Sequence, residues 1–224
     1  MLPAFHFKNL FAPGQAVGPA PAVDLRQFKL GPIAGLLIFF AALFQADGAS
    51  AQFFNDPTFK LYSIRETVAK LLPDAQVLTR RDVVLTPRQL RWLRKNKNWD
   101  SDTTEFTFYH AKNKARKITR TLVIFPENTR HGPMVMAVAL SNRGRVLDVL
   151  LTDIQNKTMD WVLPLVRAGY LKTFAGKDRN LKLKLPKKFK SSTFPPISQT
   201  YALLIANAVK KSAQLFHVVL QEKQ

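Results

Sequence analysis

The end of the chain constrains the fold most. Apolar side chains recur there at helical spacing over several turns, with a helical stripe formed by Tyr201, Leu204, Ile205, Ala208, Val209, Ser212, Leu215, Phe216 and Val219. A long amphipathic helix of this kind must bury its stripe against a sheet or another helix. The segments before it have mostly the pattern of strands, so the sequence predicts an α+β fold with this C-terminal helix packed on an antiparallel sheet.

The middle of the chain supplies the strands. Alternating or β-branched residues predict strands at 76–85, 105–110, 117–125, 133–141 and 145–152, which makes a sheet of about four to five strands. The last two strands flank Asn142, Arg143 and Gly144, and glycine can take the positive φ that a tight hairpin requires. Pro126 is expected to end the strand at 117–125.

The remaining segments predict helices and one long loop. Helical spacing is present at 58–72, and Thr86 is followed by Pro87 and Gln89, which is typical of a capped helix start. Two short helical pieces at 159–168 and 170–175 meet at Gly169. Residues 178–193 are predicted to be a lysine-rich loop. The alternation of Leu181, Leu183 and Leu185 with lysines is also typical of a short edge strand whose lysines prevent pairing with another chain.

Composition excludes several classes of function. The 224 residues contain no Cys and four scattered His, so disulfides, iron–sulfur clusters, thiol nucleophiles and zinc sites are not expected. Glycine-rich phosphate loops and the G-x-S-x-G elbow are also absent from the sequence. We therefore predict no catalytic and no metal-binding residues. The function must come from a cofactor, an anionic partner or the fold itself.

The N-terminal part has the features of an export signal. An apolar run at 30–44 is shorter than the ~20 residues of a membrane span, follows Arg26 and Lys29, and precedes Ala49-Ser50-Ala51. This predicts a leader at 1–51, cleavage after Ala51, and an exported domain at 52–224 that is periplasmic or associated with the outer face of the cytoplasmic membrane. A retained membrane anchor and a buried core helix are the alternatives.

Charge points to an anionic partner. Lys and Arg total 34 against 15 Asp and Glu, giving a net charge of +19. Between Arg167 and Lys190 the basic residues outnumber Asp178, the one acidic residue of that stretch. Such a segment can bind a phosphate, an anionic membrane surface or nucleic acid. Export argues against nucleic acid and favours a solvated basic face or an acidic protein partner.

A few isolated residues have less specific interpretations. Asp148 and Asp153 flank a strand end and are expected to be solvated, and His131 is expected in an exposed turn. The three tryptophans are expected to anchor the core, rather than to stack on a ligand. They are Trp92, Trp99 and Trp161.

Several motifs, taken in order, resemble one known family. They are LPDA at 72–75, VLTPRQ at 84–89, FYHA at 108–111, VMAVAL at 135–140 with NRGRV at 142–146, YLKTFAGK at 170–177 and AVKKSA at 208–213. This succession is similar to the FMN-binding domain family, which includes the flavin-carrying subunits of the sodium-translocating quinone reductase and of the Rnf electron-transport complex. The resemblance implies an electron-transfer protein that carries FMN and meets a redox partner protein or membrane complex.

The resemblance also implies where FMN would bind. Members with covalent FMN carry S-G-A-T-x-[ST] before the final helix, and the threonine hydroxyl is joined to the flavin phosphate. This chain has Ser198, Gln199 and Thr200 at that place without the Gly-Ala pair. Thr200 is the first choice for the acceptor and Ser198 the second, in a loop where helix N–H groups would meet the phosphate.

The altered motif leaves alternatives open. Gln199 would crowd the approach of a phosphate, and Pro195 and Pro196 remove two N–H donors. Covalent FMN, non-covalent FMN and a cofactor-free relative, which acts as a basic binding or scaffold module for an acidic partner, therefore all remain possible. In the plainest interpretation, Ser198 or Thr200 only caps the last helix.

Overall fold

The computed structural model describes residues 58–99, 103–190 and 192–221. The chain divides into two units at the boundary between Ala51 and Gln52, and the described residues all belong to the second unit. The predicted leader, its apolar run and its cleavage site lie outside the described residues.

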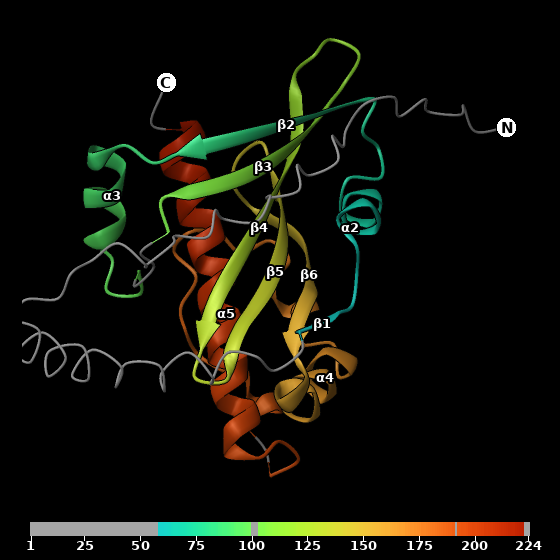
Figure 1. Cartoon of the computed structure of the whole chain (residues 1–224), viewed down its shortest axis with the longest axis vertical. Helices are drawn as coiled ribbons and strands as arrows, with labels where there is room; N and C mark the ends of the chain where they lie inside the picture. Colours follow the sequence, from blue (N-terminus) through green and yellow to red (C-terminus); the bar gives the residue numbers. More distant parts are fainter. Residues whose placement is uncertain (1–57, 100–102, 191, 222–224) are drawn as a thin grey trace, which may run out of the picture. The chain divides into compact units, whose positions relative to one another are not determined.

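One antiparallel sheet of six strands forms the framework, in the order β1-β6-β5-β4-β3-β2 (Figure 1). The predicted α+β class is confirmed, with one strand more than expected. The strands are β1 (Thr58–Lys60), β2 (Val77–Val84), β3 (Glu105–Lys112), β4 (Ile118–Thr129), β5 (Gly132–Ser141) and β6 (Val146–Gln155). The helices are α2 (Ile64–Leu71), α3 (Pro87–Arg94), α4 (Met159–Arg167) and α5 (Pro196–Phe216), with short turns η3 (Asn156–Thr158), η4 (Leu171–Phe174), η5 (Lys187–Phe189) and η6 (His217–Gln221).

The additional strand comes from the segment predicted to be one helix at 58–72. Its first residues form β1, where Thr58 pairs with Gln155 of β6, and only the second part forms α2. Ser63 separates the two because its hydroxyl accepts from the Glu66 N–H while Glu66 reaches back to the Ser63 N–H. This capping box fixes a helix start inside the apolar pattern.

Pro126 does not end its strand, contrary to the sequence prediction. β4 continues to Thr129, and Pro126 pairs in register with Val135 of β5. β3 pairs with β4 only as far as Val123, so the other side of Pro126 carries no ladder partner. Proline is tolerated at such an edge because no N–H is needed there.

Two other local predictions are confirmed. Thr86 caps α3 through its hydroxyl, with Pro87 in the first turn and Gln89 completing the box. Gly144 and Gly169 have φ of 74° and 82°, at the hairpin and at the break between α4 and η4.

The sheet separates a large core from a small one. Strand residues alternate between the faces, so Val123 and Phe125 of β4 face α5 while Leu122 and Ile124 face α2. Figure 1 shows α5 running along the sheet behind β4 and β5. Most of the apolar burial, and the residues around the site described below, belong to the α5 side.

Helix α5 is buried on nearly every side. Between Ser198 and Phe216 only Thr200 and Leu203 are exposed. The side away from the sheet is covered by the 159–190 region, where the Tyr170 hydroxyl donates to the Ala202 carbonyl at 2.8 Å. By length and hydropathy, 196–221 is the one described helix that could cross a membrane, but 67% of its most apolar stretch is buried within the domain. We interpret α5 as the core helix.

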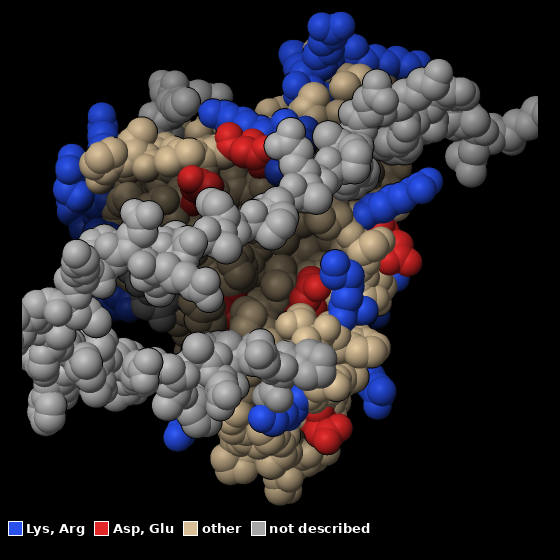
Figure 2. All heavy atoms as spheres, in the orientation of Figure 1, with Lys and Arg blue, Asp and Glu red and all other residues tan. Residues whose placement is uncertain are grey.

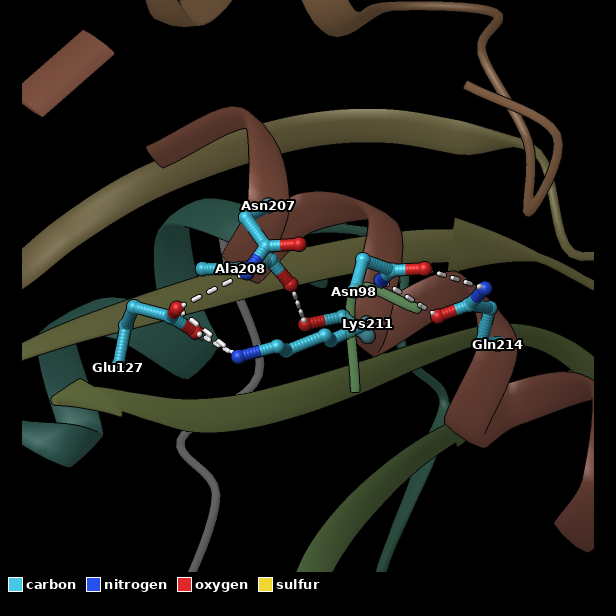
Figure 3. Close-up of polar contacts among 7 residues, drawn as sticks. Asn98, Glu127, Asn207, Ala208, Lys211 and Gln214 are labelled. Atoms are coloured by element: carbon cyan, nitrogen blue, oxygen red, sulfur yellow. Dashed lines mark hydrogen bonds and ion pairs between the residues drawn. The ribbon is translucent and has the colours of Figure 1, made fainter. Parts of the chain in front are cut away.

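A buried ion pair joins α5 to the sheet (Figure 3). The Lys211 Nζ lies 2.9 and 3.0 Å from the two carboxylate oxygens of Glu127, and both side chains are 2% exposed. The Asn207 amide donates to Glu127 Oε1 at 3.1 Å, and farther along the helix the Asn98 and Gln214 amides bond each other. Because charges inside a core tolerate few geometries, this cluster fixes the position of α5 along β4. The helical periodicity did not indicate it.

His110 on β3 gives the domain a pH-dependent stability. Its ring is 4% exposed and its Nδ1 lies 3.0 Å from the Thr121 hydroxyl. Burial, with smaller contributions from Arg81 and Lys112, lowers the pKa of His110 to about 4. In the unfolded chain, His110 takes up a proton near its ordinary pKa of 6.5. Above that pH the ring is neutral in both states, and its burial carries no penalty for the free energy of unfolding. Part of the stability is lost as the pH falls toward about 4.

We expect the free energy of unfolding to fall between about pH 6.5 and pH 4 by on the order of 2 kcal/mol through this one group. Denaturant unfolding at a series of pH values measures the loss. The His110→Gln variant is expected to have a flatter profile over this range, with other titrating groups unchanged. Identical profiles for the two proteins would show that His110 does not titrate in this way.

Candidate functional site: a lysine groove beside the C-terminal helix

The predicted flavin segment is part of a helix and not a loop. α5 begins at Pro196 with Pro195 as its N-cap, and no side chain caps it. The interpretation of Ser198 or Thr200 as a cap is therefore wrong. The Gln199 amide donates to the Phe194 carbonyl at 2.9 Å, and the Thr200 hydroxyl donates to the Pro196 carbonyl at 3.1 Å.

The three residues differ in accessibility. Ser198 is 1% exposed, Gln199 is half-buried and Thr200 is exposed. Helix geometry places Leu203 next to both Thr200 and Ala206, because residues three apart are neighbours, whereas Thr200 and Ala206 lie about 120° apart around the axis of α5. Thr200 and Leu203 are exposed, and Ala206 lines a groove about 9 Å farther along the helix than Thr200, at 1.5 Å per residue.

That groove has a volume of about 630 Å³. We call it the lysine groove. Its buried wall is apolar and aromatic, formed by Tyr170, Phe174, Leu185 and Ala206, and its exposed rim carries Lys177, Lys182, Lys184 and Lys187. Asp178 is the one acidic residue in the lining. An apolar wall with a cationic rim suits a planar ligand that carries an anionic group.

The loop over the groove is held by its apolar side chains. The alternating leucines do not form the edge strand that their spacing suggested: 181–186 has no strand pairing, and the Lys184 N–H bonds the Lys182 carbonyl at 2.8 Å. Leu185 and Phe189 are buried instead, and the Phe189 ring lies 4.8 Å from that of Tyr170. Burial of these two residues leaves the intervening lysines in solvent.

Tyr170 is a rigid part of the wall. Its ring contacts Phe174 and Phe189, and its hydroxyl donates a hydrogen bond to the Ala202 carbonyl. Burial raises the pKa of Tyr170 far above its ordinary value of 10. The phenol is therefore neutral at every physiological pH and shapes the groove without titrating in it.

Another aromatic cluster lies at the start of α5. His131 was expected in an exposed turn, but it is half-buried, with Nδ1 2.8 Å from the Tyr201 hydroxyl and its ring 5.2 Å from that of Trp161. Burial raises the pKa of Tyr201. As expected, the tryptophans serve the core: Trp99 is buried in it, and Trp92 and Trp161 pack against it.

The acidic residues singled out in the sequence do not form a further site among the described residues. Asp148 is exposed and accepts from the Val149 N–H, and Asp153 is half-buried within β6. Within 58–99, 103–190 and 192–221, no three His, Asp or Glu side chains gather as a metal site would require.

Basic residues also cover the edge of the sheet around β2. They come from β2, from α3 and from the β3–β4 hairpin, and include Arg81, Arg88, Arg91, Arg94, Lys95, Lys114, Arg116 and Lys117, all exposed. Figure 2 shows them as blue groups over α3 and over the hairpin tip. Charged side chains on an edge strand prevent pairing with another chain and create a positive surface.

Comparison with known proteins adds no relative, since no family model and no curated protein matches the chain. The likeness to the FMN-binding domain family therefore rests on the motifs in the sequence.

Proposed function

We propose that this domain binds FMN and serves electron transfer at the outer face of the cytoplasmic membrane. The observation that carries the proposal is the lysine groove, in which an aromatic and apolar wall meets four lysines beside α5. Its volume lies in the range of ligand sites, which is about 300–1,000 Å³. The order of motifs resembling the FMN-binding domain family supports the same conclusion.

The residues around the groove match the two halves of FMN. The wall of Tyr170, Phe174 and Leu185 suits the apolar ring system, and the rim of Lys182, Lys184 and Lys187 suits the phosphate. When bound, FMN supplies the redox chemistry, and the protein supplies orientation and electrostatics. The lysines would attract the dianion, and the loop that carries them would limit access of water to the rings.

Thr200 remains the first choice for covalent attachment, with Ser198 second. Thr200 is exposed about one and two-thirds turns before Ala206 of the groove, whereas Ser198 is buried. Neither residue, nor Gln199, contributes to the lining of the groove. This arrangement favours non-covalent FMN, with an ester at Thr200 as the covalent alternative.

A titration of the purified protein with FMN and with riboflavin tests the proposal. Quenching of flavin fluorescence should reach saturation for FMN at micromolar concentrations, and riboflavin should bind at least tenfold more weakly because it lacks the phosphate. Failure of FMN to bind at millimolar concentration would refute the flavin site.

Export is the second part of the proposal, since the partner would be a redox protein or complex at the membrane. N-terminal sequencing of the protein from its native host should find Gln52 as the first residue, which is the result of cleavage after Ala51. Protein that retains residues 30–44 in the membrane fraction would replace export with anchoring.

The second candidate function is a cofactor-free basic module that binds an acidic partner. The cationic edge around β2 and α3 is the observation that favours it (Figure 2). Binding of this kind weakens steeply with salt, because it depends on exposed charges. Association with an acidic protein or an anionic membrane that is lost at high salt, in protein without flavin, would favour this alternative.

A further inference from the structure

A second, smaller cavity lies at the β5–β6 hairpin, beside the end of α5. Its volume is about 200 Å³, and its lining includes Arg143, Gly144, Asp178, Arg179 and His217. We call it the arginine pocket. It combines two guanidinium groups and an imidazole with one carboxylate, so its lining is cationic even when His217 is neutral.

Arg179 has a hydrogen-bond donor that the folded chain does not use. Its Nη1 is buried and has no hydrogen-bond partner among the described residues. Neither Arg179 nor Arg143 forms an ion pair with a described carboxylate. The neighbouring Asp178 accepts instead from the Asn180 N–H at 2.8 Å. Because a guanidinium always carries its charge, burying an N–H of this group without an acceptor costs stability.

The opposite wall is held firmly in place. Gly144 has φ of 74°, and a Cβ added there would lie 3.0 Å from the Phe216 ring, so the hairpin packs closely on the end of α5. His217 lies next to Phe216, with its ring 5.2 Å from that of Trp92. The His217 Nδ1 lies 2.8 Å from Gln221 Oε1, an oxygen that only accepts. Nδ1 therefore carries the proton of that bond, and Nε2 is left for a ligand.

We propose that the arginine pocket binds a phosphate-class oxyanion. The two guanidiniums would donate to its oxygens, as arginine does in phosphate recognition. The His217 Nε2 would bond a protonated oxygen, or donate when the ring is charged. An anion there would give the Arg179 guanidinium an acceptor that the described residues do not supply. This inference stands on the pocket alone and holds whether or not the lysine groove binds a flavin.

Two sources offer this chemistry, namely free phosphate and the phosphate of a ligand bound in the lysine groove. The pocket and the groove share Asp178 and Asn180 in their linings, so the segment 178–180 separates them. A single ligand that reaches past this segment could occupy both.

Calorimetric titration of the full-length protein with inorganic phosphate tests the proposal. We expect saturable binding with one site, and at least a tenfold weaker affinity in Arg179→Met, which keeps the length of the side chain and removes the guanidinium. Arg143→Gln should weaken binding in the same sense. Arg116→Gln, at the exposed tip of the β3–β4 hairpin, is the matched control and should bind phosphate like the unmodified protein.

Thermal unfolding keeps the test decisive. Without phosphate, Arg179→Met should unfold at or above the temperature of the unmodified protein, since Nη1 has no bond to lose. With phosphate, the unmodified protein and Arg116→Gln should gain stability, and Arg179→Met should not. The proposal is overturned if phosphate does not bind, or if Arg116→Gln weakens binding as much as Arg179→Met does.

Competition identifies the source of the oxyanion. If the pocket takes the phosphate of a cofactor, inorganic phosphate should displace FMN and leave riboflavin binding unchanged. If the pocket takes a free anion, phosphate and FMN should bind together without competition. Both results require phosphate binding that depends on Arg179. A protein that binds no flavin would refute the proposed function and leave the phosphate titration as the test of this pocket.

Discussion

Replacement of Lys211 by methionine is expected to lower the free energy of unfolding by about 3–5 kcal/mol. Lys211 and Glu127 are each 2% exposed, and the ammonium lies against both carboxylate oxygens. Removing the lysine leaves the carboxylate inside the core without its cationic partner, although the Asn207 amide still donates to Glu127 Oε1. For a domain of this size the loss corresponds to a fall of about 10 °C in the melting temperature.

Two comparisons separate burial from simple loss of charge. Lys210→Met makes the same chemical change at the adjacent, half-buried residue and should alter stability by less than about 0.5 kcal/mol. Glu127→Leu combined with Lys211→Met removes both charges and should recover most of the lost stability, since apolar replacement of a buried pair is often neutral. Equal effects of Lys210→Met and Lys211→Met, measured by denaturant unfolding, would show that the ion pair does not hold α5 on β4.

The second large effect concerns the lysine groove. Changing Lys182, Lys184 and Lys187 together to glutamine should weaken FMN binding at least tenfold, because three cations at the rim contribute about 0.5 kcal/mol or more each to holding the phosphate. Riboflavin affinity should change little. The melting temperature should also stay within a few degrees, since these side chains are exposed and make no ion pair with a described residue.

The matched control for this variant is a triple change on the cationic edge, Arg88, Arg91 and Lys95 to glutamine, which alters net charge equally at a distance from the groove. If both triple variants weaken FMN binding equally, the effect is that of net charge and the groove is not the site. Lys188 is excluded from the first variant because its ammonium donates to the Ala168 carbonyl at 3.0 Å and so takes part in the fold.

The local elements were predictable where neighbouring residues alone determine them. Thr86, Pro87 and Gln89 contain all the groups of the α3 capping box, and Gly144 supplies the positive φ of its hairpin. Pro126 failed as a strand end because its tolerance depends on where β3 stops pairing with β4, which is a property of the sheet. The start of α5 was misplaced because Pro195 and Pro196 begin the helix without a side-chain cap.

Long-range partners could not be predicted. Lys211 lies within a helical pattern that suggested an ordinary amphipathic face, and its buried position depends on Glu127, which is distant in sequence. The lysine-rich segment was correctly predicted to be a loop, but its groove forms only when Leu185 and Phe189 reach Tyr170 and α5. Charge density in the sequence indicated a site in this region, and packing determines its shape.

The most direct test of the account is the absorption spectrum and intact mass of the protein purified from its native host. We expect the visible absorption of oxidised flavin, with free FMN released on denaturation if the cofactor is non-covalent. If attachment is covalent, the protein mass should be increased by one FMN less one water, and this increase should be absent in Thr200→Val. Colourless protein of unmodified mass that also fails to bind added FMN would contradict the account.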